Sequence, residues 1–307
     1  MGARRTAVLV LLPTLLLTAS ACEQTSQPAS HVRTDDAVTV ASFNFPESVL
    51  LAEIYALALQ DSRIRVERET ALGTRELVMP ALVQGLVELV PEYAGSALLF
   101  FAGEGSASTD HEANQIALAG HTIGYGVSPL EPSPAEDQNG FAVTRATATR
   151  FDLHTLSDLA RVSGQLVFGG PPECLRRPSC LPGLRSTYGI EFGDVLSTLD
   201  AGGPRTAAAL AQGTVDVALM FTSDGAIELY DFVLLQDDRG LQPAENVTPI
   251  VRRDTLERFP ELAGILNTVS AALTTGDLRS MNAEVARGAD PRSIAAAWLV
   301  RHGLVGT

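Results

Sequence analysis

The sequence predicts an α/β protein with two lobes and a cleft for a small ligand between them. Short β-branched or apolar segments alternate with segments of helical periodicity, a pattern typical of a sheet covered by helices. The alternation starts near residue 37, begins afresh near residue 138 and returns to a first-lobe pattern near residue 247. Ligands of such proteins bind in loops at strand ends, and the gap between two lobes commonly holds a small molecule.

The first part of the chain reads as strand, loop and helix. Residues 37–42 alternate as a strand. Asn44 is a candidate N-cap for a helix over 49–59, because Pro46 lies in the first turn and Glu47 follows the cap by three residues. A second strand over 63–69 and a second helix over 77–84 follow, and a third strand is predicted over 87–90.

The rest of the chain repeats this alternation. Strands are predicted over 140–144, 165–168, 215–221, 232–235 and 248–251. Helices are predicted over 147–151, 156–160, 206–212, 266–273, 278–287 and 293–301. Length alone allows one large domain or two lobes. Because the pattern occurs twice, we expect lobe I over 37–137 and 247–307 and lobe II over 138–246.

The N-terminus has the order of a bacterial secretory signal. Two arginines precede an apolar run over 7–17, which is shorter than the roughly 20 residues of a membrane helix. Small residues then lead to Cys22, an arrangement that resembles the lipobox of bacterial lipoproteins. We expect a signal peptide over 1–21, lipidation of Cys22 and a flexible tether over 22–36. A soluble export signal cleaved nearby is the alternative.

The charge balance argues against a nucleic-acid partner. The chain has 36 acidic and 22 basic residues and a net charge of −14, so phosphate groups would be repelled. No segment after the signal offers roughly 18 consecutive apolar residues. The lipid on Cys22 is therefore the expected membrane contact, and it places the protein on the outer face of the cell membrane.

Two cysteines are left once Cys22 is assigned to the lipid. Cys174 and Cys180 lie in a proline-rich loop, and outside the reducing cytosol such a pair is expected to form a disulfide. The closed loop is short, so the stabilisation is expected at the low end, about 2 to 3 kcal/mol. A metal site is the alternative, although no histidine lies near them in the sequence.

A set of short motifs along the chain resembles the substrate-binding proteins of glycine betaine, carnitine and choline ABC transporters. The resemblance runs collinearly over about 38–304. The motifs are 42–47, 72–76, 91–96, 156–159, Arg177 with 181–184, 188–190, 215–217, 222–225, 235–238 and 246–249. It implies a type II periplasmic-binding-protein fold. It also implies a carrier that binds an osmolyte without chemistry and delivers it to a permease and an ATPase on separate chains.

In that family an aromatic box holds the methylated ammonium group of the ligand through cation–π and dispersion contacts. The resemblance places the box at Tyr93, Phe141, Phe221 and Glu245. Tyr93 matches, and the two phenylalanines keep the ring without the hydroxyl. At Glu245 a carboxylate replaces the usual ring and could pair with a cation or point to solvent. The alternative for each phenylalanine is a place in the core.

The resemblance also places other residues at the ligand. Arg177 and Ser96 would contact an anionic tail, as a forked donor and a hydroxyl. Asn139 stands where the family often has an acidic residue, and Phe43, with Asn44 after it, stands where many members have a basic one. Arg177 is then the fixed positive group of the site. The solute stays open among choline, betaine, carnitine, proline betaine and an unrelated small polar or aromatic molecule.

The sequence lacks the motifs of a hydrolase, a metalloprotease or a P-loop enzyme, and its five histidines are scattered. We therefore expect no enzymatic activity, cofactor or metal. Asp224 is expected to cap a helix. A sensor would need a DNA-binding helix pair or a membrane-spanning helix on the same chain. A lipoprotein that docks on another protein without binding a solute is the other alternative.

Overall fold

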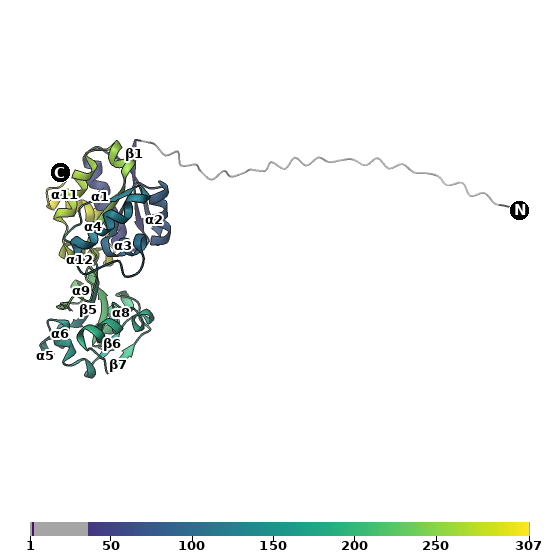
Figure 1. Cartoon of the computed structure of the whole chain (residues 1–307). Helices are drawn as coiled ribbons and strands as arrows, with labels where there is room; N and C mark the ends of the chain where they lie inside the picture. Colours follow the sequence, from purple (N-terminus) through teal and green to yellow (C-terminus); the bar gives the residue numbers. More distant parts are fainter. Residues whose placement is uncertain (1, 3–35, 307) are drawn as a thin grey trace. The chain divides into compact units, whose positions relative to one another are not determined.

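The structure, a computed structural model, describes residue 2 and residues 36–306. Asp36–Thr307 form one compact unit, shown in colour in Figure 1. Cys22, the predicted signal segment except Gly2 and the predicted tether except Asp36 lie outside the described residues.

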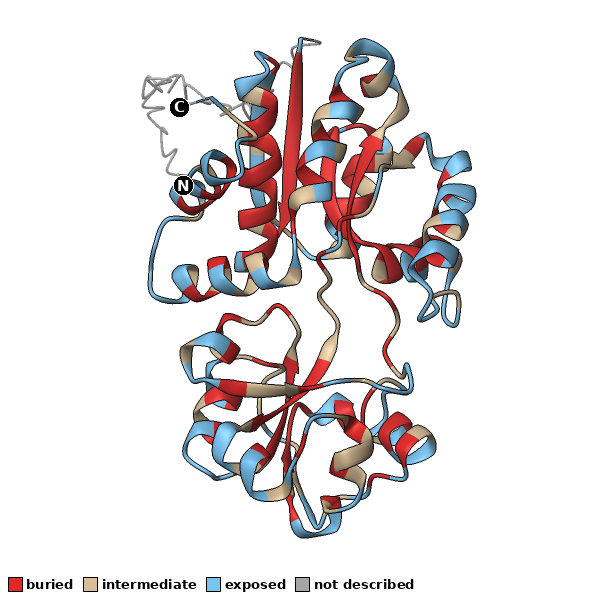
Figure 2. Ribbon diagram, turned by 90° about the vertical axis from the view of Figure 1, so that its left-hand side faces the viewer, coloured by how far each residue is buried: buried red, intermediate tan, exposed pale blue. Residues whose placement is uncertain are grey.

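The described residues form two five-stranded sheets, one in each of two lobes (Figure 1 and Figure 2). The first has the order β2–β1–β3–β10–β4 and contains β1 (Ala37–Phe43), β2 (Arg65–Gly73), β3 (Leu89–Tyr93), β4 (Val127–Pro129) and β10 (Val247–Arg252). The second has the order β7–β6–β8–β5–β9 and contains β5 (Asn139–Thr144), β6 (Val167–Gly169), β7 (Asp194–Leu196), β8 (Val217–Phe221) and β9 (Phe232–Leu235). The two-lobed α/β fold predicted from the sequence is confirmed.

Helices surround both sheets. With the first sheet lie α1 (Pro46–Asp61), α2 (Arg75–Gln84), α3 (Ala94–Ala102), α4 (His111–Thr122), η1 (Ile123–Tyr125), α10 (Arg253–Arg258), α11 (Leu262–Ala272), α12 (Thr275–Ala286) and α13 (Pro291–Arg301). With the second lie α5 (Arg145–Phe151), α6 (Leu156–Ala160), η2 (Ser163–Gln165), η3 (Pro172–Leu175), α7 (Leu181–Gly183), η4 (Leu184–Tyr188), α8 (Pro204–Ala211) and α9 (Gly225–Leu229).

The first sheet is covered on both faces, which explains why all seven residues of β1 are buried. Val38 and Val40 belong to the core formed with α1, α11 and α13. Because side chains alternate along a strand, Ala41 and Phe43 belong to the core on the other face, formed with α2, α3 and α4. Trp298 of α13 is fully buried, so the first face is tightly filled.

Two extended segments carry the chain between the sheets, one before β5 and one before β10, and both are visible in Figure 2. They run antiparallel, since Glu136 and Asn246 form an isolated β-bridge. The N–H of Asp137 donates to the carbonyl oxygen of Glu245 at 3.1 Å. Residues 136–138 and 244–246 therefore lie side by side where the two lobes meet.

Of two predicted helix N-caps, one is wrong and one is confirmed. The N-cap of α1 is Phe45, so the prediction of Asn44 as its cap was wrong. Asn44 is instead bound to the end of β2, because its N–H donates to the carbonyl oxygen of Gly73 at 3.0 Å. Asp224 does cap α9, as predicted, and its side chain accepts from the N–H of Ala226.

Candidate ligand-binding cleft

A cleft of about 990 Å³ lies between the two sheets and is lined by residues from both lobes. The first lobe lines it with the starts of α1 and α2, the junction of β3 with α3, and part of α12. The second lobe contributes the start of β5, the loops before α7 and α8, and the start of α9. Six of the nine residues expected to bind the ligand line this cleft: Tyr93, Ser96, Asn139, Arg177, Phe221 and Glu245.

Phe43 and Asn44 are not among the residues that line the cleft. Phe43 is 2% exposed because the end of β1 directs its ring into the core below α2, where the Arg75 guanidinium lies 5.2 Å from the ring centre. Asn44 is exposed at the bend after β1. The ring that reaches the cleft from this motif is Phe45, which sequence reasoning missed although it lies only two residues after Phe43.

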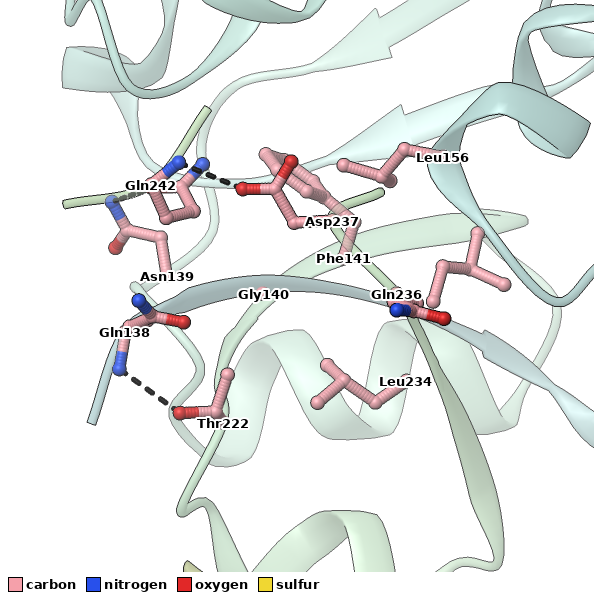
Figure 3. A pocket seen from close by; sticks show the side chains of 11 residues that line it. Gln138, Asn139, Gly140, Phe141, Leu156, Thr222, Leu234, Gln236, Asp237 and Gln242 are labelled. Atoms are coloured by element: carbon pink, nitrogen blue, oxygen red, sulfur yellow. Dashed lines mark hydrogen bonds between the residues drawn. The ribbon is translucent and has the colours of Figure 1, made fainter. Parts of the chain in front are cut away.

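Phe141 is also absent from the cleft lining and is 1% exposed. Its strand lies between β8 and β9, and its ring packs in the core of lobe II, 6.3 Å from the ring of Phe168. Phe141 instead borders a smaller side pocket of about 180 Å³ (Figure 3). This side pocket shares Asn139 and Gln242 with the cleft.

Aromatic rings line the cleft from both lobes. They are Phe45 and Tyr93 from the first lobe and Phe221 and Tyr230 from the second. Phe45 and Tyr93 are stacked, with ring centres 6.3 Å apart. Phe45 is 36% exposed and Tyr230 is 51% exposed, so their faces are open to a solute. Such faces attract cations through the ring quadrupole.

Tyr93 and Glu47 form a hydrogen-bonded pair in the wall of the first lobe. The Tyr93 hydroxyl donates to Glu47 Oε1 at 2.5 Å, and the side-chain amide of Asn282 donates to Glu47 Oε2. Asn282 Nδ2 also donates to the carbonyl oxygen of Ser223 in the second lobe at 2.9 Å. Sequence reasoning used Glu47 only as a helix-start signal and missed its place in the cleft.

Carboxylates gather where the two crossing segments lie side by side. Asp137 and Glu245 both line the cleft, and Asp137 accepts a hydrogen bond from the hydroxyl of Ser223 at 2.6 Å. Burial holds the pKa of Asp137 well above its usual value, and the nearby Glu47 carboxylate raises it further. Burial likewise raises the pKa of Asp224 to about 6. Burial therefore favours the neutral forms of these carboxyl groups, and a cation beside them would favour their ionised, negatively charged forms.

Glu245 occupies the hydrogen-bond donors of Ser96. The N–H and the hydroxyl of Ser96 each donate to the Glu245 carboxylate at 2.9 Å. Burial raises the pKa of Glu245 to about 7 even though these two bonds lower it. Ser96 was expected to bind an anionic tail of the solute. In the structure both of its donors are instead occupied by the Glu245 carboxylate.

A buried ion pair lies behind the cleft at the start of α2. Arg75 lines the cleft and forks onto both carboxylate oxygens of Glu92, whose side chain is 0% exposed. Glu92 also accepts from the N–H of Tyr93 at 2.7 Å. Sequence reasoning missed Arg75 as a cleft residue. Its charge is neutralised by Glu92, so it adds little net positive charge to the cleft.

Arg177 has a different environment from Arg75. It lines the cleft from the loop before α7, and within residues 36–306 its side chain forms no ion pair or hydrogen bond. Ser179 lies two residues later and lines the cleft as well. Arg177 is therefore the cleft cation whose charge is free to meet an anionic group.

The two lobes touch where α12 meets the start of α9. Arg279 Nη2 donates to the carbonyl oxygen of Thr222 at 2.8 Å, and Ser280 donates to Glu228 at 2.7 Å. Gly225 packs directly on the backbone of α12, since a Cβ at this position would lie 2.3 Å from the Ala283 nitrogen. This contact fixes one edge of the cleft.

In the described part of the chain, no group of three or more His, Cys, Asp or Glu residues is arranged to hold a metal ion. None of the helices in that part is long and apolar enough to cross a membrane.

Comparison with known proteins relates the chain to transport proteins. The family model described as the substrate binding domain of ABC-type glycine betaine transport system matches residues 36–301. The glycine betaine-binding protein YehZ of Escherichia coli (strain K12) is 28% identical over 313 residues, which cover 95% of this chain and 99% of YehZ. The carnitine transport binding protein OpuCC of Listeria monocytogenes is 25% identical over 278 residues, which cover 90% of this chain and 88% of OpuCC.

A solved structure has the same arrangement of lobes. A crystal structure described as a glycine betaine/carnitine/choline ABC transporter aligns with a TM-score of 0.81 at 25% sequence identity. The alignment covers 87% of this chain and 99% of that chain.

Proposed function

The chain belongs to the family of substrate binding domains of ABC-type glycine betaine transport systems, and we propose that it binds a quaternary ammonium solute in its cleft. The protein is the substrate-binding component of a transporter of the glycine betaine, carnitine and choline type. Members of this family work outside the cytoplasm with permease and ATPase components. Their role is binding for transport, not catalysis.

The observation that supports this proposal is the combination of aromatic faces and carboxylates around one cleft. A methylated ammonium group has no N–H to donate, so rings and net negative charge are what attract it. Phe45, Tyr93 and Phe221 offer rings from both lobes. Asp137 and Glu245 supply carboxylates between them. Each ring contact contributes about 0.5 to 2 kcal/mol.

Arg177 suggests how an anionic tail is accommodated. Its guanidinium forms no ion pair with another described residue, whereas that of Arg75 is paired with Glu92. In the proposed pose the ammonium group lies against Tyr93 and the acidic residues, and a carboxylate of the solute faces Arg177. A zwitterion thereby has a partner for each charge.

Binding is proposed to close the cleft without any chemical step. Residues 136–138 and 244–246 would serve as the hinge between lobe I (37–137 and 247–307) and lobe II (138–246). A solute shifts the equilibrium only by its preference for the closed state, in which rings from both lobes contact it. The closed form is then what the permease recognises.

Attachment to the membrane is proposed to occur through Cys22. The small residues before this cysteine and the polar residues after it support a lipidated N-terminus with a tether to the folded domain. Mass spectrometry of the N-terminal peptide tests this directly, since lipidation adds acyl chains to the Cys22 thiol. An unmodified Cys22 in protein isolated from the cell membrane would rule out the anchor.

Isothermal titration of the full chain tests the solute. The panel contains glycine betaine, carnitine, choline and the neutral carbon analogue of choline, in which a carbon atom replaces the quaternary nitrogen. We expect choline to bind at least about tenfold more tightly than its neutral analogue, because only the charged form gains from the rings and carboxylates.

Two results would contradict the proposal. Equal affinity for choline and its neutral analogue would show that charge is not read by the cleft. No binding of any solute in the panel would favour a lipoprotein that docks on a partner without a solute. Arg177→Ala should weaken binding of a solute with a carboxylate. Arg176→Ala is its matched control, because Arg176 is a neighbouring exposed arginine outside the cleft lining.

A further inference from the structure

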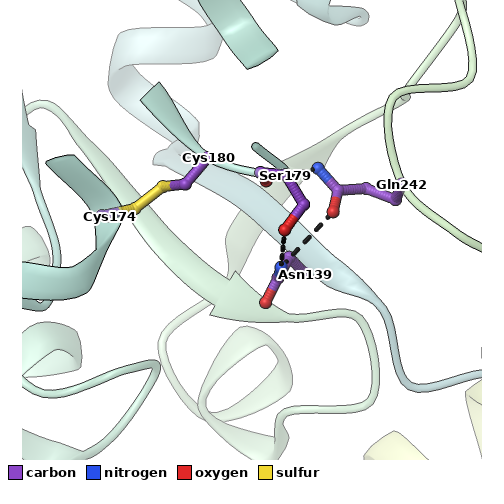
Figure 4. The surroundings of a disulfide bond; sticks show 5 residues. All are labelled: Asn139, Cys174, Ser179, Cys180 and Gln242. Atoms are coloured by element: carbon purple, nitrogen blue, oxygen red, sulfur yellow. Dashed lines mark hydrogen bonds between the residues drawn. A yellow bond between two sulfur atoms is a disulfide. The ribbon is translucent and has the colours of Figure 1, made fainter. Parts of the chain in front are cut away.

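A disulfide-closed loop supplies one wall of the cleft. Cys174 and Cys180 are joined by a disulfide whose Cα atoms are 5.2 Å apart (Figure 4). Both cysteines are buried, at 1% and 2% exposure, in the core of lobe II. The loop between them contains Arg177 and Ser179, and both residues line the cleft. The disulfide thus closes the loop that carries two residues of the cleft lining.

The cleft end of this loop is also held by hydrogen bonds. Gln242 Nε2 donates to the carbonyl oxygen of Ser179 at 2.9 Å, and Asn139 Nδ2 donates weakly to the Ser179 hydroxyl at 3.3 Å. Figure 4 shows Asn139 between Ser179 and Gln242. Asn139 begins β5, and Gln242 belongs to the chain that leads back to lobe I. These bonds therefore tie the loop to both chain segments that enter the hinge.

Below the loop, Gly183 permits a close approach. A Cβ on Gly183 would lie 2.0 Å from the carbonyl oxygen of Pro178, which belongs to the disulfide-closed loop. Only a residue without a side chain fits there, so the loop rests directly on the backbone of α7. The disulfide, the hydrogen bonds of Ser179 and the close contact at Gly183 together limit the movement of this loop.

We propose that the Cys174–Cys180 disulfide is a specificity device that holds Arg177 in position for the anionic group of the solute. This inference rests on the proposed function, because it assigns the loop to the anion-facing side of the same cleft. Arg177 is a long, exposed side chain without a partner among the described residues. A rigid loop limits the conformational freedom that such a side chain must lose when a carboxylate binds.

The consequence concerns selectivity more than stability. If the loop is freed, Arg177 samples many positions, and solutes that need it lose affinity. A solute with only a cationic group is held by the rings and the carboxylates, which lie outside the disulfide-closed loop. Cys174 and Cys180 are therefore positioning residues for solutes that contain a carboxylate.

The test compares two solutes on the full chain with and without the disulfide. Glycine betaine has a carboxylate, whereas choline has none. In the Cys174→Ser/Cys180→Ser double variant we expect the affinity for glycine betaine to fall at least about tenfold, and the affinity for choline to stay within about twofold. In an Arg177→Ala background, the same cysteine substitutions should have no further effect on glycine betaine.

Further variants separate positioning from folding. Gly183→Ala keeps the disulfide but displaces the loop, so it should lower glycine betaine affinity selectively as well. This second variant keeps the proposal testable if the cysteine variant does not fold, as monitored by thermal unfolding. Arg176→Ala lies in the same loop without lining the cleft and serves as the control, with both affinities expected to be unchanged.

The outcomes distinguish this inference from the function on which it rests. If the unaltered protein binds neither solute, the proposed function and the inference both fail. If it binds glycine betaine and folded variants lose affinity for both solutes equally, or lose none, only the inference is overturned. A selective loss of glycine betaine that is absent in the Arg177→Ala background supports it.

Discussion

The Tyr93 hydroxyl donates a hydrogen bond to Glu47 Oε1 across 2.5 Å, and this bond joins the end of β3 to the first turn of α1. Burial holds the pKa of Tyr93 well above its usual value, and the Glu47 carboxylate raises it further. The phenol therefore stays protonated and continues to donate over the physiological pH range. Its ring is held in the cleft wall, where Phe45 stacks on it.

Two substitutions at Tyr93 separate the hydroxyl from the ring. Tyr93→Phe removes a donor to a buried carboxylate and should lower the free energy of unfolding by about 1.5 to 3 kcal/mol. Because the ring stays, solute affinity should change by less than about threefold. Tyr93→Ala removes the ring and should weaken binding of choline at least about tenfold. Chemical denaturation and isothermal titration measure the two effects. Equal affinities in the two variants would show that the ring does not face the solute.

The pair of Arg75 and Glu92 should be strongly coupled. Arg75→Met leaves the fully buried Glu92 carboxylate without its cation, so we expect a loss of about 3 to 5 kcal/mol in the free energy of unfolding. Replacing both residues by Met removes the buried charge and should restore part of that loss. Urea denaturation of the two single variants and the double variant gives the coupling energy. Additive single effects would contradict a paired buried charge.

The raised pKa of Glu245 predicts how stability depends on pH. Its folded-state pKa of about 7 exceeds the usual value of 4.5, so protonation favours the folded state. This contribution is complete below pH 4.5 and is lost as pH rises through 7. Glu245→Gln cannot ionise, so the variant should exceed the unaltered protein by on the order of 3 kcal/mol above pH 8. Below pH 4.5 the two proteins should unfold alike. Denaturation curves across this range would refute the assignment if their difference were independent of pH.

Gly225 gives a test of the contact between the lobes. Gly225→Ala would place a Cβ 2.3 Å from the Ala283 nitrogen, so α9 and α12 must separate. We expect a loss of about 1 to 3 kcal/mol in the free energy of unfolding. Gly264→Ala is the matched control, because Gly264 is an exposed position of α11 and a Cβ there meets no atom within 4 Å. It should be neutral or stabilise by up to about 1 kcal/mol. Similar effects of both substitutions, seen in thermal unfolding, would argue against the close contact.

Sequence reasoning located the strands better than the rings. Apolar patterns predicted strands over 37–42 and 215–221, and these ranges overlap the buried strands β1 and β8. The same pattern could not decide which face of a strand meets the cleft. Phe43 and Phe141 stand in matching motifs, yet both rings point into cores, whereas Phe45 reaches the cleft after the bend that follows β1.

The sequence by itself determined the class of this protein, because strand and helix periods are local and the family motifs occur in a fixed order along the chain. Only the tertiary structure decided the charge of the cleft. Glu47, Asp137 and Glu245 lie far apart in sequence, and they meet only because the two crossing segments run side by side below the start of α1. The raised pKa values of Asp137 and Glu245 follow from burial and from neighbouring carboxylates, and both depend on distances that no local pattern contains.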